Sequence, residues 1–118
     1  MGYFELSVNG SDTAADAAAS LVDNMVKALK KSLQEEGNEY NTSGPVNVAM
    51  IFDEIIIPST FFKDHNYDKL QEIAIITREK LQEEYIKASG IKTNDIANKN
   101  YHCNKYKSLL KRLDKFIS

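Results

Sequence analysis

Apolar residues recur every three or four positions along three long stretches of the chain, and this spacing predicts three amphipathic helices. The first is expected from about residue 13 to about residue 36. Its apolar stripe consists of Ala18, Val22, Met25, Leu29 and Leu33, with Leu21 beside it. Ser11 or Asp12 is expected to cap its start, and Gly37 is expected to stop it.

The second helix is expected to begin between His65 and Tyr67 and to end before Gly90. Its apolar face consists of Leu70, Ile73, Ala74, Thr77, Leu81, Tyr85 and Ala88. Its other face is charged and consists of Glu72, Glu79, Lys80, Glu83, Glu84 and Lys87. The pattern therefore predicts a long helix with one face in the core and the other in solvent.

The third helix is expected to be capped by Thr93 or Asn94 and to run to about Phe116. Its apolar positions are Tyr106, Leu109, Leu110, Leu113, Phe116 and Ile117. Residues 98–104 are almost entirely polar, and we expect the helix to break there. Because the link over residues 90–94 is short, the last two helices are expected to lie antiparallel.

Residues 46–57 are ambiguous between helix and strand. Their β-branched residues favour a strand, but Pro45 fits the first turn of a helix and Pro58 its end, so we favour a short, largely buried helix. Alternation over residues 3–8 predicts a short N-terminal strand or extended arm. The expected fold is mostly α: one domain over residues 1–118, a bundle of three long helices with a short fourth element and this arm.

Length and composition fit one globular domain, since the chain has 118 residues and a formal net charge of −2. The single cysteine, Cys103, excludes an intrachain disulfide and fits a reducing compartment. No apolar run approaches the roughly 20 residues of a membrane span. The first residues carry no basic and apolar signal segment. We therefore expect a cytoplasmic protein without a membrane partner.

Charge is distributed unevenly along the chain. Residues 92–118 carry seven Lys or Arg and two Asp, a net charge of +5, which leaves −7 on the other 91 residues. One interpretation is that the basic C-terminal helix binds nucleic acid through Lys105, Lys107, Lys111, Arg112 and Lys115. The other is that these cations form a solvated face that neutralises the glutamates of the preceding helix.

The sequence offers little for catalysis or metal binding. Residues 64–68 place oxygen ligands as a calcium loop does, but Lys69 and Ile75 occupy the positions that require Gly and Glu. The side chains of His102 and Cys103 point about 100° apart on a helix, too far for a nucleophile and its base. The five glycines lie far apart, and no phosphate loop exists. We expect no catalytic site, no cofactor and no metal.

The remaining hypothesis is a protein-binding accessory factor that acts on a protein partner, for example as an inhibitor. Asp53 and Glu54 interrupt an apolar run, and a carboxylate there needs a partner or water. Phe61 and Phe62 either plug the core or anchor a partner. The acidic face expected to attract a basic partner consists of Glu72, Glu79, Glu83 and Glu84. Wide apolar stripes also make a homodimer or another homo-oligomer plausible.

The N-terminal segment resembles a group of known sequences. Gly2, Tyr3 and Phe4, followed by the turn and helix start over residues 10–16, are similar to the opening of small bacterial and phage proteins of unknown function. These proteins often carry Trp next, where this chain has Ala17. The resemblance implies a bacterial or phage source, and it brings no activity with it.

Overall fold

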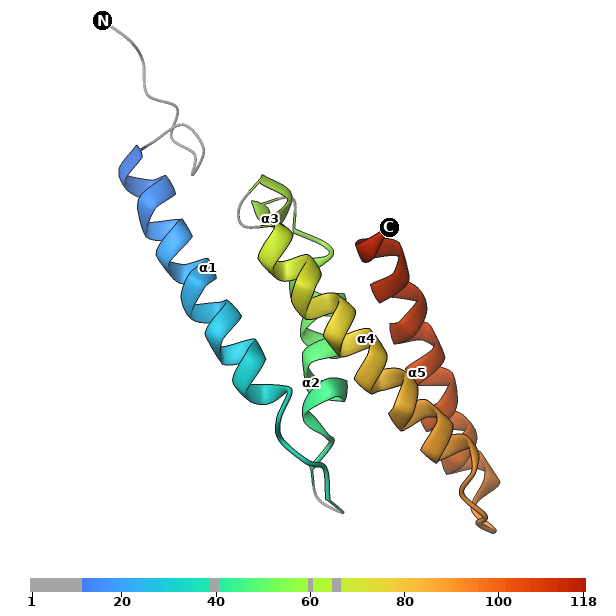
Figure 1. Ribbon diagram of the computed structural model, residues 1–118. Coiled ribbons are helices and arrows are strands. Elements are labelled where there is room, and N and C mark those ends of the chain that lie inside the picture. The colour runs from blue at the N-terminus through green and yellow to red at the C-terminus, as the bar shows by residue number, and fades with distance from the viewer. Residues whose placement is uncertain (1–11, 39–40, 60, 65–66) are drawn as a thin grey trace, which may run out of the picture.

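A computed structural model describes residues 12–38, 41–59, 61–64 and 67–118. All regular structure in these residues is helical, as Figure 1 shows. The predicted mostly α fold is thus confirmed, with three long helices: α1 (Asp12–Ser32), α4 (Tyr67–Ser89) and α5 (Ile96–Ile117). The arm expected over residues 3–8 and the cap expected at Ser11 lie outside the described residues.

Helix α1 buries one stripe of apolar side chains. The buried residues at its face and C-terminal end are Ala18, Val22, Val26, Leu29 and Leu33, and Met25 is half-buried. Leu21, expected beside this stripe, is instead 69% exposed. The helix ends at Ser32, earlier than predicted, and the start of the next helix approaches its backbone closely there.

The connection from α1 to α2 (Gly44–Ile51) brings two backbone segments into very close contact. The N–H of Gly44 donates to the carbonyl of Glu35 at 2.9 Å. A Cβ atom on Gly44 would lie 1.7 Å from the carbonyl oxygen of Ser32. Ser43, the N-cap residue of α2, is buried and makes no side-chain cap hydrogen bond; its Oγ has no hydrogen-bond partner. Glycine at position 44 is therefore required by space.

Residues 46–57, which the sequence left ambiguous, are helical. Helix α2 continues directly into the π-helix η1 (Phe52–Ile56). The N–H of Ile57 donates to the carbonyl of Phe52 at 2.8 Å, the spacing of a π-turn. Phe52 and Ile56 are fully buried, and Pro58 follows the end of the helix. The buried, short helix that the sequence favoured is thus confirmed.

Helices α4 and α5 pack against each other along their length (Figure 1). The buried face of α4 follows the predicted pattern, and the Oγ1 of the buried Thr77 donates to the carbonyl of Ile73 at 2.7 Å. The expected break over residues 98–104 is wrong, because α5 is continuous there. Its cap is Asp95, not Thr93 or Asn94: the Asp95 side chain accepts from the N–H of Asn98 at 3.1 Å. Because this cap stabilises the start of α5, the helix forms there although its first turns are polar.

One core joins these elements. In Figure 1, α4 lies between α1 and α5, and α2 passes behind it. Side chains from every long helix and from α2 and η1 meet in a single cluster; its fully buried members include Val22, Val48, Phe52, Ile56, Leu70, Ile73, Leu81, Leu109 and Leu113. None of the described helices combines the length and the apolar character needed to cross a lipid bilayer.

Among the described residues, three exposed ion pairs connect the elements at the surface. Lys69 of α4 pairs with Asp23 of α1 at 3.0 Å. Arg112 of α5 pairs with Asp53 of η1 at 2.7 Å, and Arg78 of α4 pairs with Asp114 of α5. Exposed pairs of this kind contribute at most about 1 kcal/mol each, so the core provides most of the stability.

Candidate functional site

The outward face of α4 carries three of the four glutamates predicted to bind a partner. Glu72, Glu79 and Glu83 are exposed, and their spacing places them on one side of the helix. Three isoleucines share this side: Ile75 is 42% exposed, Ile76 is 40% exposed and Ile86 is 59% exposed. We call these six residues the α4 face. It combines carboxylates with exposed apolar side chains.

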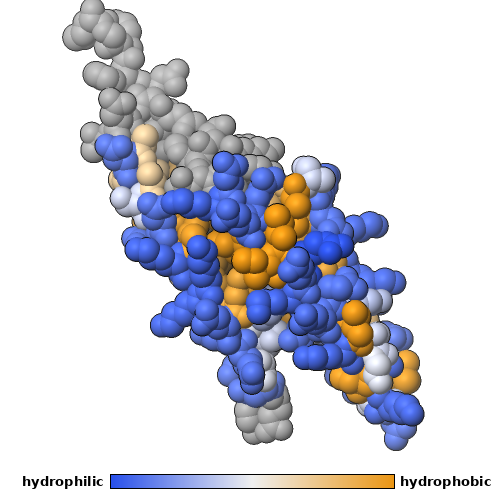
Figure 2. Space-filling model, viewed as in Figure 1, coloured by the Kyte–Doolittle hydropathy of each residue, from blue (hydrophilic) through white to orange (hydrophobic). Residues whose placement is uncertain are grey.

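The space-filling view shows the same mixture of hydrophilic and hydrophobic surface. In Figure 2, orange patches interrupt the blue surface along the course of α4 and again near the α4–α5 connection. At that connection Ile91 is 54% exposed and Ile96 is 56% exposed. Scattered exposed apolar residues are ordinary, but several on one helix face are typical of an interaction site.

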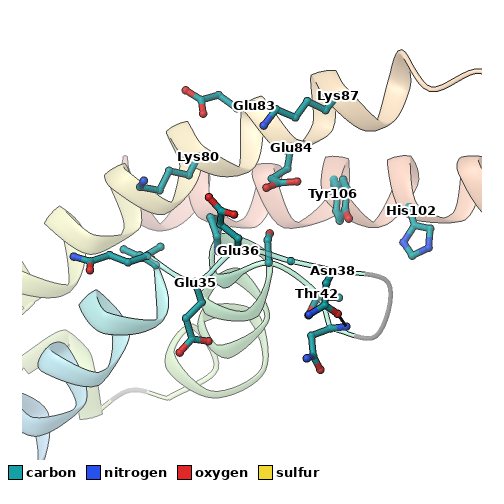
Figure 3. Close-up of a pocket in the computed structure, with 16 residues that line it drawn as sticks. Glu35, Glu36, Asn38, Thr42, Lys80, Glu83, Glu84, Lys87, His102 and Tyr106 are labelled. Carbon is teal, nitrogen blue, oxygen red and sulfur yellow. Dashed lines mark hydrogen bonds between the residues drawn. The ribbon is translucent and has the colours of Figure 1, made fainter.

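Glu84, the fourth predicted glutamate, does not belong to the α4 face. It is half-buried and lines a central pocket of about 870 Å³ between the α1–α2 connection, α4 and α5. Figure 3 shows Glu84 and Tyr106 reaching into this space from α4 and α5, with Glu36 opposite, whereas Glu83 turns away. Lys80 and Lys87 also line the pocket. Glu84 therefore shares this pocket with two lysines of its own helix.

Tyr106 has a perturbed pKa in this pocket. Burial raises the pKa of its phenol above the ordinary value of 10.0, and the charges of Glu84 and Cys103 raise that pKa further. Its ring lies 6.2 Å from the ring of His102, which lines the same pocket. The neutral phenol is thus favoured, and Tyr106 is suited to donating a hydrogen bond rather than to acting as a base.

Asp53 is paired with a cation, whereas Glu54 faces water. Glu54 is exposed. The carboxylate of Asp53 accepts from the Nε of Arg112 at 2.7 Å, and its side chain is 25% exposed. The partner is an arginine of α5, one of the cations predicted to contact nucleic acid. A structural pairing therefore accounts for Asp53.

Phe61 and Phe62 lie at the start of the short helix α3 (Phe61–Asp64). Both are half-buried and pack against the core cluster. Their ring centroids are 5.1 Å apart in an edge-to-face arrangement. The rings thus cover the core, as one of the two alternatives predicted, and they keep some exposed surface; the anchoring of a partner stays a prediction.

A second concavity, which we call the end groove, lies where η1, α3 and the end of α5 meet. Its volume is about 410 Å³. Its lining residues are Ile56, Ile57, Ser59, Phe62, Arg112, Lys115 and Phe116. The groove thus brings together Phe62, predicted to bind a partner, with Arg112 and Lys115, predicted to bind nucleic acid.

The five cations predicted on the C-terminal helix do not form one surface. Lys107, Lys111 and Lys115 are exposed and follow one another at one-turn spacing, whereas Lys105 is half-buried and Arg112 lies toward η1. Among the described residues, the ion pairs of α5 run to Asp53 and Arg78, not to the glutamates of α4. The expected neutralisation of those glutamates by α5 is therefore not what the ion pairs show.

The other described residues that were considered for catalysis or metal binding do not come together in a site. His102 and Cys103 are neighbours on α5 and half-buried. Within the described ranges, no group of three His, Cys, Asp or Glu side chains is placed to hold a metal ion. The string expected to resemble a calcium loop includes residues 65 and 66, which lie outside the described residues.

Sequence reasoning missed the end groove and the isoleucines of the α4 face. The spacing of Ile75, Ile76 and Ile86 between glutamates was visible in the sequence, and a second apolar stripe opposite the core face was the available signal. Comparison of the chain with protein-family models, with curated proteins and with solved structures finds no match. The N-terminal resemblance to small bacterial and phage proteins stays a prediction.

Proposed function

We propose that this protein acts by binding another protein through the α4 face, as an accessory factor that recruits or inhibits its partner. The observation that carries this proposal is the exposure of Ile75, Ile76 and Ile86 on the side of α4 away from the core. A partner would cover these side chains, and the surrounding glutamates would select a partner with a basic rim.

Burial of the isoleucines of this face would contribute part of the binding energy of a contact. The three isoleucines are each exposed by about two-fifths or more. Their burial contributes on the order of 3 kcal/mol, at about 2 kcal/mol for a fully buried aliphatic side chain. That amount corresponds to roughly a hundredfold in affinity. Glu72 and Glu79 add long-range attraction, which mainly raises the association rate.

The test identifies the partner and then removes the face. A photoreactive amino acid at position 79, on the exposed α4 face, cross-links partners in a lysate of the source organism, and mass spectrometry identifies them. The purified partner is then titrated by calorimetry against a variant carrying Ile75→Ser and Ile86→Ser. We expect at least tenfold weaker binding, and a variant carrying Ile91→Ser and Ile96→Ser is the matched control. Equal affinities for the two variants would refute this surface.

A second copy of the chain is a special case of this proposal. Light scattering over a dilution series measures the mass directly. A dimer built on the α4 face dissociates on dilution and is lost in the variant carrying Ile75→Ser and Ile86→Ser, whereas a monomer at all concentrations leaves a different protein as the partner.

The stripe of Lys107, Lys111 and Lys115 supports nucleic-acid binding as a second candidate function, because all three are exposed at one-turn spacing. Its affinity for a labelled duplex would fall with salt at a log–log slope of about −0.9 per phosphate contact. The double change Lys107→Glu and Lys111→Glu should abolish such binding. Absence of a polarisation change at low salt eliminates this candidate.

A further inference from the structure

We infer that the end groove is a docking site for a short segment of the partner protein, one that carries a large apolar side chain next to an Asp or Glu. This inference rests on the proposed protein-binding function and adds a second contact to it. It concerns residues on η1, α3 and α5, so it is tested separately from the α4 face.

The apolar walls of the groove are held in place before any ligand arrives. The ring of Phe116 lies edge to face with the fully buried Phe52, at a centroid distance of 5.4 Å. Phe62 is held in the same way by Phe61. The fully buried Ile56 forms part of the lining. Preformed apolar walls favour binding because little side-chain freedom is lost when a ligand enters.

Charge decides which ligand fits. The charged side chains that the structure describes in the lining of the groove are Arg112 and Lys115, and both are cations. They lie three positions apart on α5, so both project toward one side of the helix. Asp53 already pairs with Arg112, but Arg112 remains 47% exposed and Lys115 is exposed. An apolar ligand with a carboxylate therefore complements the groove.

A peptide segment fits these dimensions. A volume of about 410 Å³ accommodates one or two large side chains. Aromatic and aliphatic anchors in such pockets supply most of the affinity of protein contacts, and flanking charges supply orientation. The chemistry thus points to an acidic residue followed or preceded by Phe, Leu or Ile. A fatty-acid anion shares this chemistry and is the competing occupant.

The probe is a phage-displayed library of random peptides selected on the intact protein. We expect enrichment of peptides that carry Phe, Leu or Ile beside Asp or Glu. A selected peptide, labelled with fluorescein, is then titrated by fluorescence anisotropy. Amide shifts in a ¹H–¹⁵N spectrum should concentrate on the residues that line the groove, namely Ile56, Ile57, Ser59, Phe62, Arg112, Lys115 and Phe116. Selection without acidic enrichment, or shifts elsewhere on the chain, would overturn the inference.

Charge reversal provides matched variants on one helix. Lys115→Glu, at an exposed residue of the groove, should weaken the selected peptide at least tenfold. Lys107→Glu makes the same change at an exposed residue that does not line the groove, and it should alter affinity less than twofold. Equal losses in the two variants would mean non-specific attraction to α5 and would refute the groove as the site.

Two further arms separate the remaining outcomes. The variant carrying Ile75→Ser and Ile86→Ser should bind the selected peptide normally, so failure of the α4 face and failure of the groove are distinguishable. Dodecanoate tests the lipid alternative. If dodecanoate shifts the groove amides and no acidic peptide is selected, the occupant is a fatty-acid anion and the peptide inference is wrong.

Discussion

The connections that lead into α2 and into α5 fix the start of the helix by different kinds of contact. Before α2, Gly44 lies so close to the end of α1 that no side chain fits, while the cap residue Ser43 makes no cap hydrogen bond. Before α5, Asp95 caps the helix through Asn98. There an added Cβ on Gly90 would meet its nearest neighbour at 3.5 Å, which is ordinary contact.

The difference shows where each helix start gets its position. Helix α2 begins where the backbone of α1 stops it, so tertiary contact fixes its first residue. Helix α5 begins in solvent, with residues 90–98 all exposed, so its own cap fixes its first residue. At the α1–α2 connection, substitution of the glycine should therefore lower the free energy of unfolding more than substitution of the cap residue. At the α4–α5 connection the order should be reversed.

The largest effect is expected from Gly44→Ala. The new Cβ would lie 1.7 Å from the carbonyl oxygen of Ser32, and backbone must shift to admit it. We expect a loss of at least about 3 kcal/mol in the free energy of unfolding, measured by urea denaturation. Gly90→Ala is the matched control and should change stability by less than about 0.5 kcal/mol. Similar losses at both glycines would break the comparison.

A smaller effect is expected from Asp95→Ala. The change removes the acceptor for the N–H of Asn98, and loss of such a cap costs about 1 kcal/mol. Denaturation with urea measures it, and the α5 amide of Asn98 should exchange faster with solvent. Asp95→Asn keeps a capping oxygen and should restore most of the stability. An unchanged midpoint in Asp95→Ala would show that the cap contributes nothing here.

Ser43→Ala, at the corresponding cap position of α2, should cost less than about 0.5 kcal/mol. The Oγ of Ser43 is buried without a hydrogen-bond partner, and removing an unpaired buried hydroxyl is neutral or stabilising. The same urea series applies. A loss as large as that of Asp95→Ala would mean that Ser43 caps α2 in solution.

The smallest effect concerns Tyr106, whose ring lines cavities beside both connections. Its pKa is raised in the folded chain, so the unfolded chain loses the phenolic proton first as pH rises. The contribution to stability is present below pH 10 and is lost as pH rises through the folded pKa. The decrease in the free energy of unfolding between pH 9 and pH 11 should therefore be smaller in Tyr106→Phe than in the wild type. Tyr101→Phe, at a ring that is 67% exposed and lines neither cavity, is the matched control.

The local pattern predicted the long helices well. A periodic apolar stripe such as that of α4 is buried as one face only when the segment is helical. The end of α1 was not predictable, because Gly44 approaches it from a later part of the sequence and no local pattern shows that contact. The continuity of α5 was missed because polar residues in an exposed half of a helix were interpreted as a break. The end groove depends on partners such as Asp53 and Arg112, 59 positions apart, and no local pattern places them.

The packing of α4 against α5 has an electrical consequence. Within Ile96–Ile117 the sequence contains six Lys or Arg and one acidic residue, Asp114, and that residue is the one paired with α4. Its partner there is Arg78. The contact leaves the net charge of each helix as the sequence sets it: +5 for Ile96–Ile117, from six cations and one acid, and −1 for Tyr67–Ser89, from four cations and five acids. This difference between two neighbouring helices creates an asymmetric field, which would orient an approaching charged protein before contact.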